Sequence, residues 1–297
     1  ALQYANSGNG WLGAELIELD ETGSASLPQV AVDTSNNAMV AWAQGYPDGF
    51  GSEFYGISAN YYRAAQGGWV GAKRIDDNTT GTAYASGTVR IAFDPSGNAI
   101  AVFVYNLNSI NEWFSIYTNR FLVADYQNTS GGWGTSHTID DNNIGATVEP
   151  SLIIDSSGNA IAVWQQHYGS STLYDIYSNQ FDLKAFNPPT SNGWGVPKPI
   201  ELAANNAGFP VIALAPSGNA IVAWLSDITL TTSTPTAVHY NANSGWETVT
   251  KPIGLERKVE FISLKIDSVG NATAVWVQLD NDGIGGQIRN IYANRYD

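Results

Sequence analysis

The stretch Asp155-Ser156-Ser157-Gly158-Asn159-Ala160-Ile161-Ala162-Val163-Trp164 recurs along the chain and decides its fold. A near-identical copy runs from Asp94 to Phe103, and looser copies occupy residues 33–42, 215–224 and 267–276. Aspartate at the first position and glycine at the fourth predict a type I turn followed by a left-handed residue, a common hairpin connection. Because the aspartate can accept hydrogen bonds from the turn amides, we interpret it as structural and not as catalytic or metal-binding.

A Gly-Trp pair recurs in step with this turn. Its tryptophans stand 52 to 64 residues apart, at Trp11, Trp69, Trp133, Trp194 and Trp246. Each repeat contains an apolar strand before the turn, a strand after it, a strand of the Ile-Tyr-x-Asn type and the Gly-Trp segment, with no helical periodicity. Repeats of this length with four strands each predict a β-propeller in which one repeat forms one blade.

The sequence therefore predicts an all-β protein, a five-bladed β-propeller with four-stranded blades. We expect one domain over residues 1–297, with the strand before the turn innermost and the Gly-Trp strand outermost. The last repeat ends without a Gly-Trp segment, so we expect residues 11–19 to complete the last blade and close the ring. Residues 1–8 have no place in this scheme and are an extra edge strand, a contact with a neighbouring subunit or a remnant of a longer array. The repeats cover approximately residues 11–66, 67–130, 131–191, 192–244 and 245–297.

Composition excludes several classes of function. The formal charge of −14, from 13 basic and 27 acidic residues, argues against binding to a phosphate backbone. The absence of cysteine excludes disulfides and thiolate chemistry. No run of about 20 apolar residues exists that would span a membrane. The start at Ala1 without methionine is consistent with a removed signal peptide or an excised domain, and we expect an exported bacterial protein, extracellular or at the cell surface.

Three short motifs also carry a family resemblance. Ser-Gly-Asn-Ala-Ile-Ala-Val-Trp (157–164), Ile-Tyr-Ala-Asn-Arg-Tyr (291–296) and Gly-Gly-Trp-Gly (131–134) resemble repeats of secreted bacterial β-propeller proteins of unassigned function. The first two strands of each repeat also resemble the NHL-type blade. The resemblance implies a propeller and, by itself, no activity.

The candidate ligand-binding residues lie in the loops that break the repeat, because binding residues of such scaffolds concentrate in variable loops. The loops between the second and third strands are expected on one face of the disc. Of their residues, Trp113, Tyr46, His167 and Tyr168 are the predicted ligand contacts. The repeated Gly-Trp tryptophans are sugar platforms on one reading, but packing between blades is the preferred one.

Acidic residues supply two alternative sites. Glu149 and Glu260 precede innermost strands and are the candidate catalytic carboxylates of a glycoside hydrolase or lyase, which needs two acids across a cleft. Asp280 and Asp282 have calcium-like spacing but lack the distal glutamate of an EF-hand loop. No cofactor is expected unless calcium binds there. The acidic pairs Asp20-Glu21, Asp76-Asp77 and Asp140-Asp141 are expected to make the loop face negative.

These observations leave three functions open. The leading one is a non-enzymatic, lectin-like binding or surface-interaction protein with a glycan or protein ligand on the variable-loop face. The second is a glycoside hydrolase or lyase. The third is a structural subunit that assembles through the N-terminal strand, since an edge strand can pair with another chain. The sequence alone does not identify the ligand.

Overall fold

The protein is all-β, as the repeats predict. The computed structural model describes residues 4–5, 10–11, 13–18, 23–47, 53–77, 84–106, 114–140, 145–167, 173–188, 190–201, 206–281 and 286–297. Within these ranges the chain forms five antiparallel sheets in sequence order, a two-stranded ribbon near the N-terminus and one short 3-10 helix, η1 (Val123–Asp125). No helix in these ranges is long and apolar enough to cross a membrane.

The five sheets are the predicted blades, and each runs from its innermost to its outermost strand in chain order. Blade 1 contains β3 (Ala25–Val32), β4 (Ala38–Pro47), β5 (Glu53–Arg63) and β6 (Gly68–Trp69), with β7 (Lys73–Arg74) further along β5. Blade 2 contains β8 (Tyr84–Phe93), β9 (Ala99–Asn106), β10 (Ser115–Phe121) and β11 (His137–Thr138). Blade 3 contains β12 (Thr147–Ile154), β13 (Ala160–His167), β14 (Tyr174–Asn187) and β15 (Ser191–Trp194), with β16 (Lys198–Pro199) also on β14.

The last two blades follow the same order with one difference. Blade 4 contains β17 (Gly208–Leu214), β18 (Ala220–Ser226), β19 (Thr234–Asn241) and β20 (Gly245–Trp246), with β21 (Lys251–Pro252) on β19. Blade 5 contains β22 (Lys258–Ile266), β23 (Ala272–Asn281) and β24 (Gln287–Tyr296). The strand order predicted within a blade is therefore confirmed, and in the described residues blade 5 has three strands.

The repeated turn has the predicted hydrogen bonds. In the third copy Gly158 donates to the Asp155 carbonyl at 3.0 Å, and the amides of Ser157 and Asn159 donate to Asp155 Oδ1 at 2.8 and 2.9 Å. The fourth residue is left-handed, with φ of 84° at Gly158 and 63° at Asn36. The turn aspartate is thus a structural anchor, as predicted.

Apolar side chains fill the interfaces between consecutive blades. Each second strand has one large aromatic residue in its interior, and all five are buried: Trp42, Phe103, Trp164, Trp224 and Trp276. Phe103 packs with Met39 and Ala41 of blade 1, and Trp164 packs with Ile100 and Val102 of blade 2. In blades 2 to 4 both faces of the second strand meet a neighbouring blade, so β9, β13 and β18 are buried almost throughout. In the end blade 5, β23 alternates between buried and more exposed residues over its first part.

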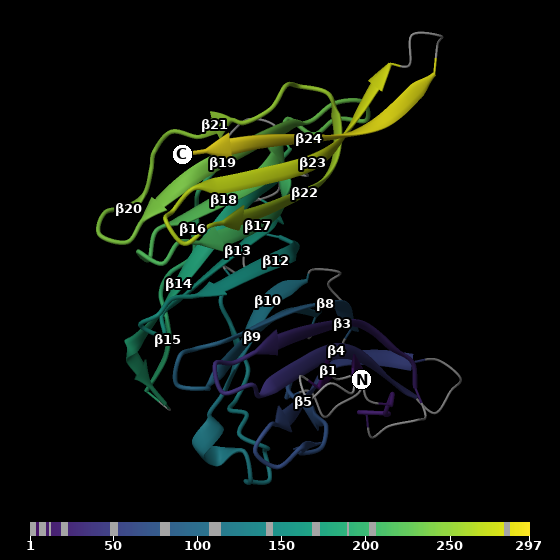
Figure 1. Ribbon diagram of the computed structural model, residues 1–297, viewed down its shortest axis with the longest axis vertical. Coiled ribbons are helices and arrows are strands. Elements are labelled where there is room, and N and C mark those ends of the chain that lie inside the picture. The colour runs from purple at the N-terminus through teal and green to yellow at the C-terminus, as the bar shows by residue number, and fades with distance from the viewer. Residues whose placement is uncertain are drawn as a thin grey trace.

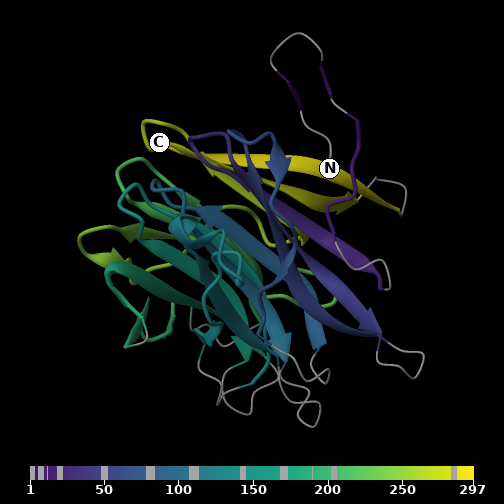
Figure 2. The same ribbon diagram turned by 90° about the horizontal axis from the view of Figure 1, so that it is seen from below.

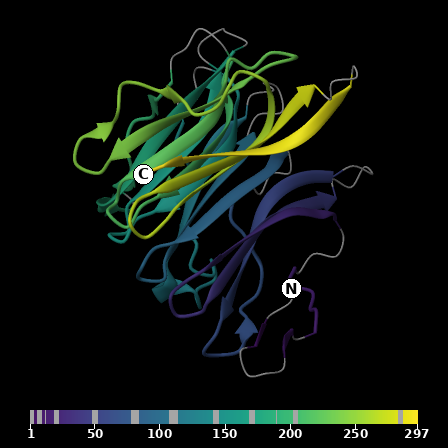
Figure 3. The same ribbon diagram turned by 45° about the horizontal axis from the view of Figure 1, so that its top comes forward.

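The blades follow one another around an arc, with blade 1 at one end and blade 5 at the other (Figure 1). Figures 2 and 3 show the same succession from two further directions. The innermost strands β8, β12, β17 and β22 each pack on the innermost strand before them, but β22 makes no comparable contact with β3. The arc is therefore not closed by packing of its end blades.

The predicted completion of blade 5 by residues 11–19 is not observed in the described residues. Strand β2 (Gly10–Trp11) pairs with β1 (Tyr4–Ala5), and β24 pairs only with β23. Residues 13–18 form no strand, and the Ile17 carbonyl accepts a hydrogen bond from Asn60 Nδ2 of blade 1 at 2.7 Å. A fourth segment contacts both the third strand of its own blade and the next blade. The repeat pattern does not say which of these two contacts is kept.

Of the acids expected on a negative loop face, Asp76 and Asp140 accept backbone amides of their own blades, whereas Asp77 is exposed. Asp76 is buried, and its Oδ2 accepts the amide of Ile57 at 2.6 Å. Asp140 Oδ2 likewise accepts the amide of Ile116 at 2.9 Å. Each carboxylate thus accepts an amide of the third strand of its own blade, which is why an acid follows the isoleucine of the Gly-Trp segment. Asp20, Glu21 and Asp141 lie outside the described residues.

Candidate functional site: a groove between blades 2 and 3

The connection between the third and fourth strands differs in length among the blades. It covers residues 63–68 in blade 1 and 241–245 in blade 4, but 122–132 in blade 2 and 182–193 in blade 3. In blade 3, β14 continues beyond Phe181 and returns through β15, with Phe186 opposite Asn192. This hairpin extends from the body of the protein at the lower left of Figure 1. Blades 2 and 3 therefore both have a long connection, and in blade 3 it forms a β-hairpin.

Turn chemistry closes the hairpin. The Asn187 carbonyl accepts the amide of Thr190 at 2.9 Å, and Pro188 stands at the second turn position, where its fixed φ favours a tight turn. Gly193 then adopts φ of 81°. A Cβ there would lie 2.4 Å from the Phe181 ring, so only glycine lets Trp194 follow so closely.

A groove of about 600 Å³ lies between this hairpin and the outer part of blade 2. Blade 3 contributes aromatic and hairpin residues, and blade 2 contributes polar residues from β10 and β11. The lining residues that matter chemically are Thr118, Asn119, Arg120, His137, Phe181, Phe186, Asn192 and Trp194. This size is typical of a pocket that holds a small organic ligand.

Aromatic rings form one wall of the groove. The ring centroid of Phe181 lies 5.8 Å from that of Phe186 and 5.7 Å from that of Trp194. Phe181 is buried, whereas Phe186 and Trp194 are half-buried. Flat apolar faces of this kind accept the apolar face of a ligand ring.

Arg120 is the charged group of the groove and lies against two of these rings. Its Nη2 donates to Asp94 Oδ2 at 2.8 Å, and its side chain is 8% exposed. The guanidinium carbon lies 4.9 Å from the ring centroids of both Phe181 and Phe186. Burial lowers the pKa of Arg120, and the Asp94 carboxylate opposes that shift. The group therefore remains a cation held by a carboxylate and two aromatic rings.

Two nitrogen atoms of Arg120 have no hydrogen-bond partner among the described residues. Nε and Nη1 are buried without one, while Nη2 donates to Asp94. An unsatisfied buried polar group costs about 1–3 kcal/mol, so these atoms favour a molecule that supplies the missing partners. A ligand oxygen that reaches the Arg120 guanidinium would supply one.

The groove can bind but lacks an acid pair. Among its described lining residues there is no aspartate or glutamate, and Asp94 behind Arg120 is already engaged in the ion pair and the turn. Glycoside hydrolysis needs two carboxylates on either side of the bond that breaks. The groove offers a ligand aromatic rings and hydrogen-bond donors.

Tyr46, a predicted ligand contact, lies at the opposite end of blade 1 from the turns. Its ring stacks on Phe54 at 5.5 Å, and Arg74 lies over it at 4.6 Å. Its hydroxyl is 2.9 Å from Ser58 Oγ. A pocket of about 260 Å³ there includes Tyr46 with Trp42. Tyr46 thus faces its own blade, and its ligand role stays a prediction.

His167, a second predicted ligand contact, lies at the end of blade 3. The ring centroid of His167 lies 3.9 Å from that of Tyr174, and burial lowers the pKa of the imidazole. His167 therefore packs at the end of blade 3 beside its neighbouring strand. Trp113 and Tyr168 lie outside the described residues.

The candidate catalytic carboxylates each face an arginine. Glu149 has φ of 53° at a bulge of β12 and interacts electrostatically with Arg90. Glu260 precedes a bulge of β22 and lies 3.1 Å from Arg289 Nε. No described contact joins the two glutamates, so their catalytic role stays a prediction.

The Asp280 carboxylate accepts hydrogen bonds from three side chains of its own blade. Gln278, Asn290 and Tyr292 donate to its two oxygens at 2.7, 2.8 and 2.7 Å. These hydrogen bonds, with that of Asn290 the largest cause, hold the pKa of Asp280 below its usual range. Asp282 lies outside the described residues, and no group of three or more potential metal ligands occurs within the described ranges. The calcium site stays a prediction.

Sequence reasoning missed the groove because it compared only the loops between second and third strands. The signal was present in the spacing from the third-strand aromatic residue to the Gly-Trp tryptophan, which is longest in repeat 3. The groove also lies at the turn end of the blades: Phe181 pairs with Ala160 directly after the turn, whereas Tyr174 pairs with His167 beside the variable loop.

Comparison with known proteins supports the fold. No family model matches the chain, and no curated protein matches it. A solved protein of unknown function from Dyadobacter fermentans is similar over 98% of this chain and 81% of its own, with a TM-score of 0.56 and 13% identity.

Two carbohydrate-active enzymes also share the fold. An ulvan lyase of polysaccharide lyase family PL25, solved with a GlcA-Rha3S ligand, matches 94% of this chain and 71% of its own, with a TM-score of 0.53 and 12% identity. The Penicillium chrysogenum α-L-arabinanase, complexed with arabinobiose, matches 90% of this chain and 80% of its own, with a TM-score of 0.50 and 11% identity. The propeller fold is therefore shared with glycoside hydrolases, lyases and a protein of unknown function.

Proposed function

We propose that this protein is a non-enzymatic, extracellular glycan-binding propeller whose ligand lies in the groove between blades 2 and 3. The observation that carries the proposal is Arg120, a buried cation with two unpaired nitrogen atoms, beside the rings of Phe181 and Phe186. A sugar ring offers an apolar face to aromatic side chains and oxygens to the donors of an arginine.

The shared fold of carbohydrate-active enzymes is consistent with a glycan ligand, but binding in this chain rests on its own residues. A protein ligand would use a larger and flatter surface of about 800 Å² per partner. The groove instead has the volume of a pocket for one or two sugar units. Its lack of described acidic lining residues favours binding over cleavage.

The proposal is tested on a glycan array, followed by titration calorimetry with the best glycan. Phe186→Ala removes a half-buried ring of the groove wall that packs at the edge of the interblade core. We expect its affinity to fall about tenfold, which corresponds to about 1.4 kcal/mol. The matched control is Phe261→Ala, since Phe261 is 79% exposed and lies on β22, away from the groove.

Three results would count against the proposal. The first is that no glycan on the array binds, with or without EDTA. The second is that Phe186→Ala and Phe261→Ala lose affinity equally. The third is that incubation of the protein with the bound glycan yields shorter products. The last result would favour the hydrolase or lyase alternative, and Glu149→Gln and Glu260→Gln would then identify the acids.

A further inference from the structure

The outer edge of blade 5 has no strand beside it in the described part of the chain. Strand β24 pairs with β23 along its full length, but its other edge is open (Figure 1). Ile291 in this strand is 74% exposed and Tyr296 is 50% exposed. An open strand of this length is a template for pairing with another strand.

The other four blades show what belongs on this edge. In each, a Gly-Trp segment lies along the third strand, and its tryptophan packs on the aromatic residue that ends that strand. The ring centroids are 5.4 Å apart for Tyr62–Trp69, 5.6 Å for Phe121–Trp133, 5.7 Å for Phe181–Trp194 and 5.0 Å for Tyr240–Trp246. Tyr296 is the equivalent residue of β24.

A second contact repeats at the far end of the segment. The amide of its terminal isoleucine donates to the third strand, at 2.8 Å from Ile75 to Ile57, 2.9 Å from Ile139 to Ile116, 2.8 Å from Ile200 to Ile176 and 2.8 Å from Ile253 to Pro235. The equivalent acceptor in blade 5 is Ile291, opposite Val277. These repeated contacts fix the register of any strand that would complete the blade.

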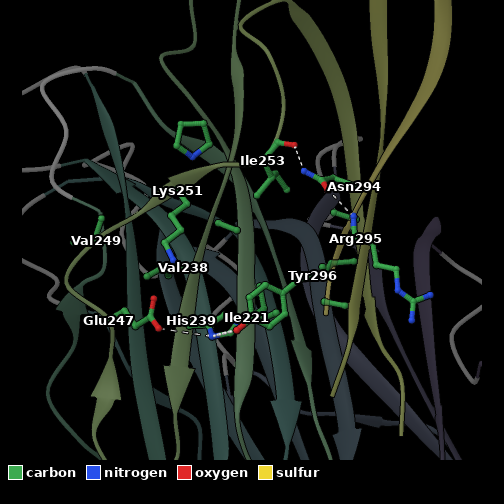
Figure 4. Close-up of a pocket in the computed structure, with 15 residues that line it drawn as sticks. Ile221, Val238, His239, Glu247, Val249, Lys251, Ile253, Asn294, Arg295 and Tyr296 are labelled. Carbon is green, nitrogen blue, oxygen red and sulfur yellow. Dashed lines mark hydrogen bonds and ion pairs between the residues drawn. The ribbon is translucent and has the colours of Figure 1, made fainter. Parts of the chain in front are cut away.

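A pocket of about 200 Å³ lies beside the open edge, between blades 4 and 5 (Figure 4). We call it the rim pocket. Val238, Ile253 and Leu264 line it, and the Tyr296 ring packs against His239 at 4.3 Å between centroids. It occupies the same place in the repeat as the groove of blades 2 and 3, where Trp194 forms part of the wall.

The N-terminal segment from Gly10 to Ile17 has the matching pattern, a Gly-Trp pair followed by an isoleucine. The Ile17 carbonyl accepts from Asn60 of blade 1 at 2.7 Å. The carbonyls of Ile75, Ile139 and Ile253 accept in the same way from Asn119, Asn179 and Asn294 of the next blade, at 2.8, 2.9 and 2.7 Å. Ile17 therefore contacts blade 1 as the last isoleucine of a preceding blade would, and Leu16 beside it is 65% exposed.

We propose that β24 receives the Gly10–Ile17 segment of a second copy of this chain, so that blade 5 of one copy is completed by blade 1 of the next. The two halves of this joint stand at opposite ends of the arc, and β22 does not pack on β3. Each end face also presents exposed apolar residues, Val30 and Val32 on blade 1 and Ile291 on blade 5. Such a head-to-tail contact produces a ring or a filament of copies.

In blade 1, Arg74 of the fourth segment lies opposite Ser58 of the third strand. The equivalent pair in the proposed joint is Leu16 opposite Tyr292, so these two positions test it. The chain has no cysteine, and single Leu16→Cys and Tyr292→Cys variants therefore carry one thiol each. Mixed and mildly oxidised, they are expected to form a disulfide dimer of twice the 31.8 kDa chain mass on non-reducing gels. The matched control replaces Leu16→Cys by Leu230→Cys, at a residue that is 95% exposed and far along the chain, and we expect no dimer above background.

The unmodified chain supplies a second readout that does not depend on these variants. The mass of the unmodified chain by light scattering is expected to rise with concentration in multiples of 31.8 kDa. The Ile291→Lys variant, which places a charge on the edge strand β24, is expected to remain a monomer. A chain that stays monomeric at all concentrations would overturn the proposal. So would a Leu16→Cys/Tyr292→Cys double variant that forms only an internal disulfide, because that result assigns the joint to closure within one chain.

Discussion

The groove of blades 2 and 3 and the rim pocket of blades 4 and 5 occupy the same place in the repeat but have different chemistry. In the groove, Arg120 pairs with the turn residue Asp94 and lies beside two phenylalanine rings. In the rim pocket, His239 stands where Arg120 does, and the turn residue is Ala215. The groove is enclosed by a long hairpin, whereas the rim pocket lies beside an edge without a fourth strand. The same scaffold thus offers a ligand site at one interface and a joining surface at another.

The largest expected effect concerns the ion pair that distinguishes the two interfaces. Asp94→Ala leaves the Arg120 cation buried without its carboxylate, so we expect the free energy of unfolding in urea to fall by about 3–5 kcal/mol. The double variant Asp94→Ala/Arg120→His copies the pair found in blade 4 and is expected to regain at least half of that loss. A single variant that loses less than about 1 kcal/mol would show that the ion pair does not hold this interface.

The next effect concerns pH. Burial is the largest cause that raises the pKa of Asp140 to about 6, against hydrogen bonds that lower it. The folded protein therefore keeps this proton up to about pH 6, while the unfolded chain releases it near pH 4, so stability is greatest below pH 4 and falls as pH rises toward 6. Asp140→Asn is expected to remove a pH-dependent change on the order of 2 kcal/mol between pH 4 and pH 7.

Urea titrations at several pH values measure this difference. Blade 4 has Gly254 after its isoleucine where blade 2 has Asp140. The pH-dependent loss of stability is therefore expected from blade 2 and not from the equivalent position of blade 4. Burial raises the pKa of Asp175 to about 6 as well, and its contribution should persist in the variant. Identical pH profiles for the variant and the unmodified protein would contradict the assignment to Asp140.

The smallest expected effect separates the groove from the predicted loop-face site. Tyr46 packs on Phe54 and Arg74 at the far end of blade 1. Tyr46→Ala is therefore expected to change glycan affinity by less than about twofold in the calorimetry used for Phe186→Ala, since contacts outside a binding site contribute little. A tenfold loss of glycan affinity in Tyr46→Ala would instead indicate that the ligand binds at the variable-loop face.

The sequence predicted the blades because their signals are local. The turn at Asp155, the buried Trp164 and the order of strands all follow from residues within one repeat. The position of the N-terminal segment was not predictable in the same way, because Ile17 contacts Asn60 of blade 1 and a pattern does not say which neighbour a strand keeps. Asp76 and Asp140 were interpreted as exposed because acids usually are, but each accepts a backbone amide of a third strand.

The candidate site was harder to predict for a different reason. Its chemistry depends on Arg120 and Phe186, which belong to different repeats and meet only through the packing of blades 2 and 3. The only local trace was the long connection 182–193. Neither residue is unusual in its own segment, so their combination became visible only in three dimensions.

Hydrogen–deuterium exchange with a saturating bound glycan tests the central claim most directly, because it reports both interfaces in one measurement. The account predicts slower exchange of residues 182–194 and of β10 and β11 when the glycan is present, with no change in the variable loops or around Tyr296. Protection confined to the variable loops, with the hairpin unchanged, would contradict it.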